Sequence, residues 1–329
     1  MTADRKTLVY RGEYPDLCIG DATLRILPSG KFIIIFETGG VTEPCVENHI
    51  RMCVSEDRGE HWSPPVPVVR LPGRATLPSE VVVTDKLTVY YQSHDGFWEN
   101  WSNWTVSSYD EGRSWSEPQP FLPALHRAYM RNICTLKDGT QLMPIERFPI
   151  PDGLDKTIGK DGSFERPENG VLIRRRGQAE WMSSSFITGS RGFAENNVIE
   201  LSDGTVVMLC RTDAGTGCLL RSDSFDGGKS WSQFRPSGIP NPGSKFRLFS
   251  LSGNRIALLH NPDPARRNPL ALWISDNDMV SWDYRKILTD FPGNVQYPDG
   301  VISADERFLH FAFDYNRHDL IYWCTELPD

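Results

Sequence analysis

The stretch SEDRGEHW, residues 55–62, carries the pattern that decides the fold. The same arrangement, Ser-x-Asp-x-Gly-x-x-Trp, returns as SYDEGRSW at 108–115 and as SFDGGKSW at 224–231. In each copy the Asp carboxylate can accept backbone N–H groups, the Gly accepts a positive φ, and the Trp can pack back against a sheet. Three copies of one turn motif in a single chain indicate a repeat architecture.

Two degenerate copies extend the series. One contains Ser275, Asn277 and Trp282, and the other lies between Arg174 and Trp181. Consecutive Trp positions are separated by about 50 to 66 residues, close to the length of one four-stranded propeller blade. These positions are Trp62, Trp115, Trp181, Trp231 and Trp282. The regular spacing predicts a β-propeller.

Apolar or alternating runs, each interrupted by turn residues, lie between the motifs and are typical of hairpins. They cover 24–36, 81–91, 133–145, 198–210, 247–259 and 301–313. Six hairpins predict an all-β, six-bladed β-propeller of four-stranded antiparallel blades, with residues 1–329 forming a single domain. No Trp motif follows the last hairpin, so we expect the N-terminal strand at 6–12 to complete that blade and close the fold.

The composition argues against several classes of function. The chain has a net charge of −8 and no run of Lys or Arg, which disfavours a nucleic-acid partner or an anionic membrane. Its seven Cys include no CxxC pair, and no His, Asp or Glu cluster has metal-ligand spacing, so we expect no metal and no other cofactor. The N-terminus shows no signal-peptide pattern and the longest apolar run, 32–36, is too short to span a bilayer, so we expect a cytoplasmic protein.

The repeated motifs resemble the Asp-boxes of the sialidase (neuraminidase) superfamily. Three further segments are similar to its BNR-repeat, predicted-neuraminidase branch: ENNVIELSDGTVVMLCRTD (195–213), IPNPGSKFRLFSL (239–251) and QYPDGVISADERFLHFAFDYNR (296–317). The resemblance implies a six-bladed propeller with an active site at one end of its axis. It further implies three arginines that hold a substrate carboxylate, a Tyr nucleophile polarised by a Glu, and an Asp that acts as acid and base.

Four of these elements have counterparts in this chain. Tyr297 matches the nucleophile and Glu195 matches the Glu that polarises it. Arg211 and Arg267 match two of the arginines, with Arg266 as a substitute for Arg267. The resemblance therefore implies that Arg211 and Arg267 bind the substrate.

Two elements have no counterpart. Where the family has its first arginine, eight residues before Pro28, this chain has Gly20 followed by Asp21. The loop that should carry the acid/base Asp offers only Glu43 and Glu47. A carboxylate at position 21 would repel a substrate carboxylate placed there. We therefore expect a neutral sugar, or an acid bound in another orientation, rather than sialic acid in its usual pose.

The internal repeat supports these positions independently of the resemblance. Counting back seven residues from the residue before each hairpin turn reaches Asp21, Glu195 and Tyr297. Equivalent positions in different blades are expected at the same end of the fold. A phenol has an unperturbed pKa near 10, so it needs a base or a positive field before it can attack an anomeric carbon. For Asp21 a structural alternative, such as pairing with Arg25, stays open.

The segment HDGFWENWSNW (94–104) is unusually aromatic, and Asp95, Glu99 and Trp101 crowd it further. Aromatic rings stack on sugar faces and a His can transfer protons near neutral pH, so we name His94 and Trp98 as candidate substrate-binding residues. Packing of these Trp side chains within the blades is the alternative. Three other candidates are His49, His126 and His260.

These residues favour a glycoside hydrolase that acts on a terminal sugar of an oligosaccharide, with a small carbohydrate as its expected partner. Tyr297 is the predicted nucleophile and Glu195 its base, and Glu43 or Asp21 is the acid/base. One alternative is a uronate or oligosaccharide lyase that uses Tyr297 with His94 or His260. The other is a carbohydrate-binding propeller without catalytic activity.

Overall fold

A computed structural model describes residues 4–96, 98, 100–125, 127–149, 167–189, 192 and 194–328. The chain divides into two compact units, the first formed by residues 1–125 with 293–329 and the second by residues 126–292. Within the described residues the one helical segment is a short 3-10 turn, η1 (Ser252–Asn254), and no helix is long and apolar enough to cross a membrane.

The first unit holds three four-stranded antiparallel sheets. In sheet order, the first two are β2 (Ile19–Ile26), β3 (Phe32–Thr38), β4 (His49–Ser55), β5 (Val66–Val69), and β6 (Ala75–Val83), β7 (Leu87–His94), β8 (Ser102–Ser108), β9 (Gln119–Pro120). The third is β24 (Val295–Ile302), β25 (Phe308–Tyr315), β26 (Asp319–Glu326), β1 (Arg5–Arg11).

The second unit holds the other three sheets. Two are regular: β16 (Asn196–Glu200), β17 (Val206–Cys210), β18 (Cys218–Ser224), β19 (Arg235–Pro240), and β20 (Arg247–Ser250), β21 (Ile256–His260), β22 (Ala271–Ser275), β23 (Tyr284–Ile287). In the remaining sheet both edge strands are split in two around β12 (Gln141–Arg147) and β13 (Glu168–Arg174). Its edge segments are β10 (Ala128–Met130), β11 (Cys134–Thr135), β14 (Met182–Ser183) and β15 (Ile187–Thr188).

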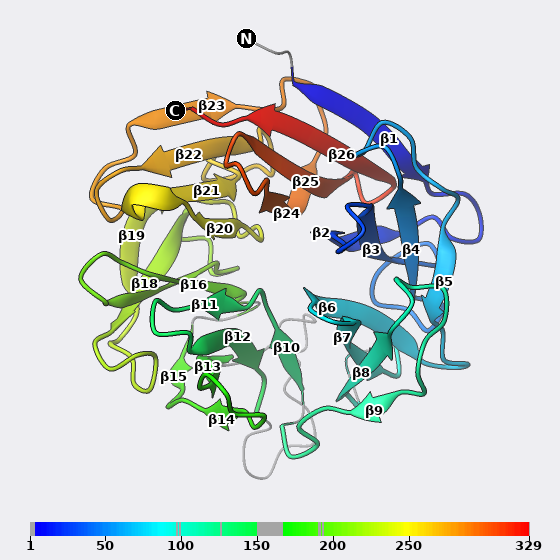
Figure 1. The fold of residues 1–329 in the computed structure, drawn as a ribbon, viewed down its shortest axis with the longest axis horizontal. Helices are drawn as coiled ribbons and strands as arrows, with labels where there is room; N and C mark the ends of the chain where they lie inside the picture. The colour runs from blue at the N-terminus through cyan, green and yellow to red at the C-terminus, as the bar shows by residue number, and fades with distance from the viewer. Residues whose placement is uncertain are drawn as a thin grey trace. The chain divides into compact units, whose positions relative to one another are not determined.

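The predicted fold class is confirmed: the chain is an all-β, six-bladed β-propeller. Each predicted hairpin corresponds to the first two strands of one blade, in the sheet orders given above. The N-terminal strand β1 pairs antiparallel with β26, from Arg5 opposite Cys324 to Arg11 opposite Asp319. Figure 1 shows the blue β1 lying beside the red β26. The last blade is therefore completed by the N-terminal strand, as the missing Trp motif predicted.

The Asp-box turns have the hydrogen bonds that their residue types predict. In the first box Ser55 Oγ donates to Asp57 Oδ1 at 2.8 Å and accepts from Gly59 N at 2.7 Å. Gly59 has a φ of 90°, which explains the glycine. The Trp62 ring then packs against Tyr322 at 5.5 Å between ring centroids. This box thus ties its turn to the blade that carries Tyr322.

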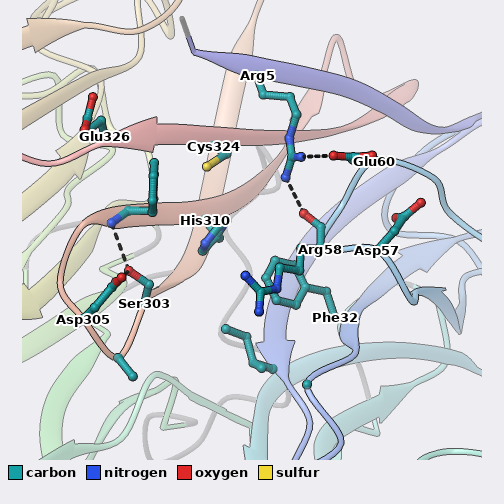
Figure 2. Close-up of a pocket in the computed structure, with 14 residues that line it drawn as sticks. Arg5, Phe32, Asp57, Arg58, Glu60, Ser303, Asp305, His310, Cys324 and Glu326 are labelled. Carbon is teal, nitrogen blue, oxygen red and sulfur yellow. Dashed lines mark hydrogen bonds and ion pairs between the residues drawn. The ribbon is translucent and has the colours of Figure 1, made fainter. Parts of the chain in front are cut away.

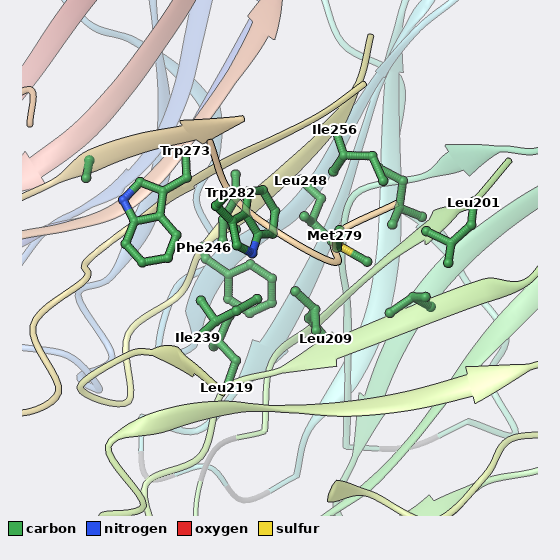
Figure 3. Close-up of a cluster of buried hydrophobic side chains, with 14 residues drawn as sticks. Leu201, Leu209, Leu219, Ile239, Phe246, Leu248, Ile256, Trp273, Met279 and Trp282 are labelled. Carbon is green, nitrogen blue, oxygen red and sulfur yellow. The ribbon is translucent and has the colours of Figure 1, made fainter. Parts of the chain in front are cut away.

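The degenerate copy at 275–282 keeps the same turn with different residues. Ser275 Oγ donates to the amide oxygen of Asn277 at 3.0 Å and accepts from Met279 N at 2.9 Å. Met279 replaces the glycine and takes a φ of 62°. Its side chain is buried with Trp282 and Trp273 in the apolar cluster of the second unit (Figure 3). Burial of the Met side chain accounts for a non-glycine residue at this position.

Candidate functional site

One register position carries a buried polar side chain in every blade. In each blade the first two strands form a hairpin whose turn is closed by a backbone hydrogen bond, such as the one from Leu27 N to the Lys31 carbonyl. The position lies six residues after the residue that provides this carbonyl, at the end of the second strand. Its six occupants are at most 2% exposed, although their strand neighbours are mostly apolar. They are Glu37, Gln92, Glu146, Arg211, Asn261 and Asp314. Because burying polar groups is costly unless they are paired, this position marks the end of each blade where function is expected.

Asp21 and Tyr297 occupy equivalent β-bulges at that end of the first unit. The register slips between Gly20 and Thr23 in β2, and between Gln296 and Asp299 in β24. Asp21 has a φ of 44° and Tyr297 a φ of 55°. Non-glycine residues rarely adopt this conformation, and bulges re-aim a side chain out of the strand pattern. The sequence prediction that these two positions are equivalent therefore holds for the backbone.

The carboxyl groups of three residues, Asp21 among them, lie close together. Oxygens of Asp21, Glu37 and Glu43 all lie within 4.8 Å of one another. Glu37 is fully buried, and neither of its oxygens has a hydrogen-bond partner. Burial raises the pKa of Glu37 to about 8, and the nearby Asp21 and Asp314 add to the rise while Arg317 opposes it. Glu43, not the exposed Glu47, is the residue of its loop that joins the cluster.

Arg317 supplies the cation of this cluster and was not predicted from the sequence. It follows β25 and forms an ion pair with Glu43 and a longer one, 3.8 Å, with Asp314. Its guanidinium carbon also lies 4.9 Å from the centroid of the Tyr297 ring. A guanidinium over an aromatic ring is a cation–π contact. The structure thus brings together Asp21, Glu43 and Tyr297 around one arginine.

Arg25, the alternative partner of Asp21, pairs elsewhere. Its guanidinium binds Glu80 of β6 at 2.6 Å and also Asp299 of β24. Both carboxylates are buried, so this triad ties three blades of the first unit together.

In the second unit Glu195 is held between two arginines. Arg131 Nη2 donates to Glu195 Oε1 at 2.5 Å, and Arg211 Nε lies 3.1 Å from Glu195 Oε2. The second contact is an ion pair without hydrogen-bond alignment. All three side chains are nearly inaccessible. Two ion pairs fix the orientation of Glu195.

Glu146 adds a second buried carboxyl group to that cluster. Its Oε1 accepts from the backbone N–H of Ala194. Burial, reinforced by the neighbouring Glu195, raises the pKa of Glu146 to about 8, against the influence of Arg131 and Arg211. Neither Glu146 nor Arg131 was predicted from the sequence.

Arg267 contacts Gly243 directly, and Arg211 is linked to Gly243 through Asp213. Arg211 pairs with Asp213 at 3.3 Å, and a Cβ added at Gly243 would lie 3.0 Å from Asp213 Oδ1. Arg267 donates to the Gly243 carbonyl at 2.9 Å. The substitute candidate, Arg266, is exposed and pairs with Asp263. The structure therefore favours Arg267 over Arg266 as the companion of Arg211.

His94 and Trp98 are buried in the second blade of the first unit. His94 is inaccessible, its ring lies 4.4 Å from Trp98, and burial lowers its pKa to about 4. Trp98 is 8% exposed and packs on Trp101 at 5.3 Å. This environment favours the packing interpretation, and sugar binding by the pair stays a prediction. Glu99, like His126, lies outside the described residues.

The other two histidine candidates are also buried. Burial lowers the pKa of His49, and it lowers that of His260 to about 3. His49 Nδ1 lies 2.8 Å from the Glu47 carbonyl, and the His260 ring packs against Trp273 at 4.6 Å. Both environments suit neutral, structural imidazoles.

A pocket of about 660 Å³ lies at the opposite end of the strands that carry Asp21 and Tyr297 (Figure 2). It is lined by Ile26 and Phe32 next to the β2–β3 turn, and by Ser303 and Phe308 next to the β24–β25 turn. Arg5 crosses its rim and pairs with Glu60 at 3.2 Å. No predicted site residue lines this pocket, so it is separate from the carboxylate cluster.

Several known proteins are similar to this chain. A BNR repeat-like domain model matches residues 36–310. The "Hadza microbial sialidase Hz136" shares the fold with a TM-score of 0.76 and 17% identity, over 97% of this chain and 68% of that one. A protein of unknown function from Dyadobacter fermentans matches with a TM-score of 0.73 and 16% identity over the full length of both chains. A search of curated proteins by sequence gives no match.

Trypanosoma rangeli sialidase is a further structural match, with a TM-score of 0.71 and 13% identity. The match covers 99% of this chain but only 60% of that sialidase. At such identities the structures establish the fold, and the family model establishes the relationship. The chain belongs to the BNR repeat-like domain family, and its propeller fold is the one found in the sialidases that it matches.

Proposed function

We propose that this protein is a glycoside hydrolase that removes a terminal sugar from an oligosaccharide, with Tyr297 as its nucleophile. The environment of Tyr297 is the observation that carries the proposal. The residue is held at a φ of 55° in a bulge, and the Arg317 guanidinium lies 4.9 Å from its ring centroid. Backbone strain of this kind is concentrated at functional sites, and a positive field assists a phenol that must act as a nucleophile.

In the proposed reaction Tyr297 Oη attacks the anomeric carbon while the bond to the leaving oxygen breaks. Glu43 or Asp21 donates a proton to that oxygen and then accepts one from the water that cleaves the glycosyl-tyrosine, so the anomeric configuration is retained. Glu195 is assigned as the base of Tyr297 by the resemblance. Arg131 and Arg211 hold its carboxylate in one orientation.

A neutral sugar fits the Tyr297 region better than a sialic acid. Three carboxylates, those of Asp21, Glu43 and Asp314, lie in the cluster that contains the guanidinium of Arg317. The fourth carboxyl group, that of Glu37, keeps its proton at neutral pH because burial raises its pKa to about 8. Low-dielectric surroundings strengthen the repulsion between the three carboxylates and a substrate carboxylate. The resemblance assigns Arg211 and Arg267 to substrate binding, and guanidinium groups can donate hydrogen bonds to vicinal hydroxyls as well as to a carboxylate.

The lyase alternative gains no support from the histidines that it requires. His94 and His260 are both fully buried, and burial lowers their pKa to about 4 and about 3. A base that abstracts an α-proton must come within hydrogen-bonding distance of it. Hydrolysis through Tyr297 needs neither imidazole.

A panel of 4-methylumbelliferyl glycosides tests the proposal. It should include a sialoside, neutral hexosides and deoxyhexosides. We expect release from a neutral terminal sugar and little release from the sialoside. Tyr297→Phe should lower kcat by about 10³-fold or more, because the attacking oxygen is lost. Tyr14→Phe, at a side chain that is 81% exposed, is the matched control and should keep full activity.

Three results would overturn the proposal. Unchanged kcat in Tyr297→Phe would exclude this nucleophile. An unsaturated, ultraviolet-absorbing product would identify elimination. Saturable binding of glycans without any turnover would identify a carbohydrate-binding propeller.

A further inference from the structure

Gly20 has no conformational reason to be glycine. It lies in β2, pairs with Glu37 across the hairpin, and does not have a positive φ. An added Cβ, however, would lie 2.5 Å from Arg317 Nη1 and 3.1 Å from Glu37 Oε2. Glycine inside a strand loses packing and weakens it. The missing side chain at position 20 is therefore explained by the space that Arg317 occupies.

Arg317 is the reverse case: it has a long side chain at a position whose backbone conformation favours glycine. It is the second central residue of the turn that joins β25 to β26, closed by His318 N donating to the Tyr315 carbonyl at 3.1 Å. Asn316 and Arg317 both have a φ of 55°. Turns with positive φ at both central positions favour Asn-Gly, and a long side chain at the second position is unfavourable. Glycine would suit position 317, and a side chain would suit position 20, but the chain has the reverse at both.

The Arg317 side chain and backbone are both anchored. Its guanidinium pairs with Glu43 and contacts the Tyr297 ring. Its backbone N–H donates to Asp314 Oδ1 at 3.2 Å, and its carbonyl accepts from Ile19 N at 3.0 Å. The turn is thereby attached to the strand that carries Gly20. Residues that contradict the local conformational preference, and that the surrounding structure holds in place, are expected at functional positions.

We propose that Arg317 is the positioning residue for Tyr297: its guanidinium takes the space left by the absent side chain at Gly20 and fixes the Tyr297 ring and the Glu43 carboxylate. The expected effect on turnover rests on the proposed function, whereas the exchange of space between positions 20 and 317 does not. The two carboxylates of Glu43 and Asp314 outweigh the one positive charge of Arg317, which favours a neutral sugar over an anionic one beside Tyr297.

A double-mutant cycle tests the exchange of space without any substrate. Gly20→Ala should lower the Tm when Arg317 is present, because the new methyl group displaces the guanidinium from Glu43. In an Arg317→Gly background it should leave the Tm unchanged or raise it. If Gly20→Ala changed the Tm equally in the parent and in the Arg317→Gly background, the claim that Arg317 occupies the space beside Gly20 would be refuted. Gly170→Ala, whose Cβ would meet Ser184 Oγ at 2.8 Å, is the control and should shift the Tm equally in both.

The positioning role of Arg317 is tested by the kinetics of its variants. Arg317→Gly suits the turn, so it should fold, and it should lower kcat by about tenfold or more with a smaller change in KM. Guanidinium chloride at low millimolar concentration should restore part of kcat, whereas Arg317→Lys should restore less because it lacks the planar group. Full kcat in Arg317→Gly, or no rescue by guanidinium, would refute the positioning role.

Failure of the proposed function can be told apart from failure of this inference. If the protein hydrolyses no glycoside, the crystal structure of Arg317→Gly provides the test. The inference expects a displaced Tyr297 ring and a reoriented Glu43 carboxylate in that variant. Unchanged side chains at both positions would refute it whatever the substrate.

Discussion

Buried carboxyl groups are the most informative single residues of this protein. Glu37 and Glu146 occupy the same register position in different blades, and both are fully buried. Burial raises the pKa of each to about 8, from an ordinary value of 4.5. Each group therefore keeps its proton in the folded chain at neutral pH but loses it on unfolding. The folded state binds more protons between these two pKa values, so stability must fall as the pH rises through that range.

Glu37→Gln should flatten this pH dependence. The amide resembles the protonated carboxyl group but cannot ionise, so the decline in the free energy of unfolding between roughly pH 5 and 8 should become shallower. Above that range the variant should be more stable than the parent. Urea unfolding at a series of pH values measures both effects, with the exposed Glu117→Gln as control. An unchanged slope would contradict the raised pKa.

Two candidate residues named from the sequence, Asp21 and Tyr297, lie on the first strand of a blade, whereas several buried groups that were not named lie on the second strand. Asp21 and Tyr297 were named as candidates because the count back from each hairpin turn runs along the first strand. Glu37, Glu146 and Asp314 lie on second strands, and a forward count of six residues from the residue whose carbonyl closes each hairpin reaches them. Arg317 could not be found in this way, since its role depends on Gly20 at the other end of the chain. Only the three-dimensional contact connects them.

At the scale of the element, the Asp-box turn explains why the fold was predictable and the site was not. Its hydrogen bonds are local, so the motif alone specifies the turn. Ser108 Oγ donates to Asp110 Oδ1 at 2.8 Å and accepts from Gly112 N at 2.7 Å, as in the first box. The Ser108 side chain is 1% exposed. The Ser, the first residue of the motif, is therefore as important to the turn as the Asp.

Ser108→Ala should destabilise the fold by about 1–3 kcal/mol, because the buried N–H of Gly112 loses its acceptor. Chemical denaturation measures the difference. Ser183→Ala, at an exposed strand residue, should change stability by less than about 0.5 kcal/mol. If both variants are equally stable, the Ser of the box has no structural role.

At the scale of the whole molecule, the chain ends share one blade. β1 adds to β26, so the edge of the last sheet is covered by a strand from the other end of the sequence (Figure 1). That blade also carries Tyr297 in β24 and Arg317 after β25. The same pairing that completes the fold thus supports the proposed nucleophile and its positioning residue.

Covalent trapping tests the central claim most directly. The reagent is the 2-deoxy-2-fluoro glycosyl fluoride of the neutral sugar that the protein is proposed to release. Attack by Tyr297 expels fluoride, and the fluorine at C2 slows the hydrolysis that follows. The tryptic peptide 287–307 contains Tyr297 as its only tyrosine.

Mass spectrometry should find one fluoroglycosyl group per chain on that peptide, and none on Tyr297→Phe. A label on any other peptide, or hydrolysis with inversion at the anomeric carbon, would contradict the account.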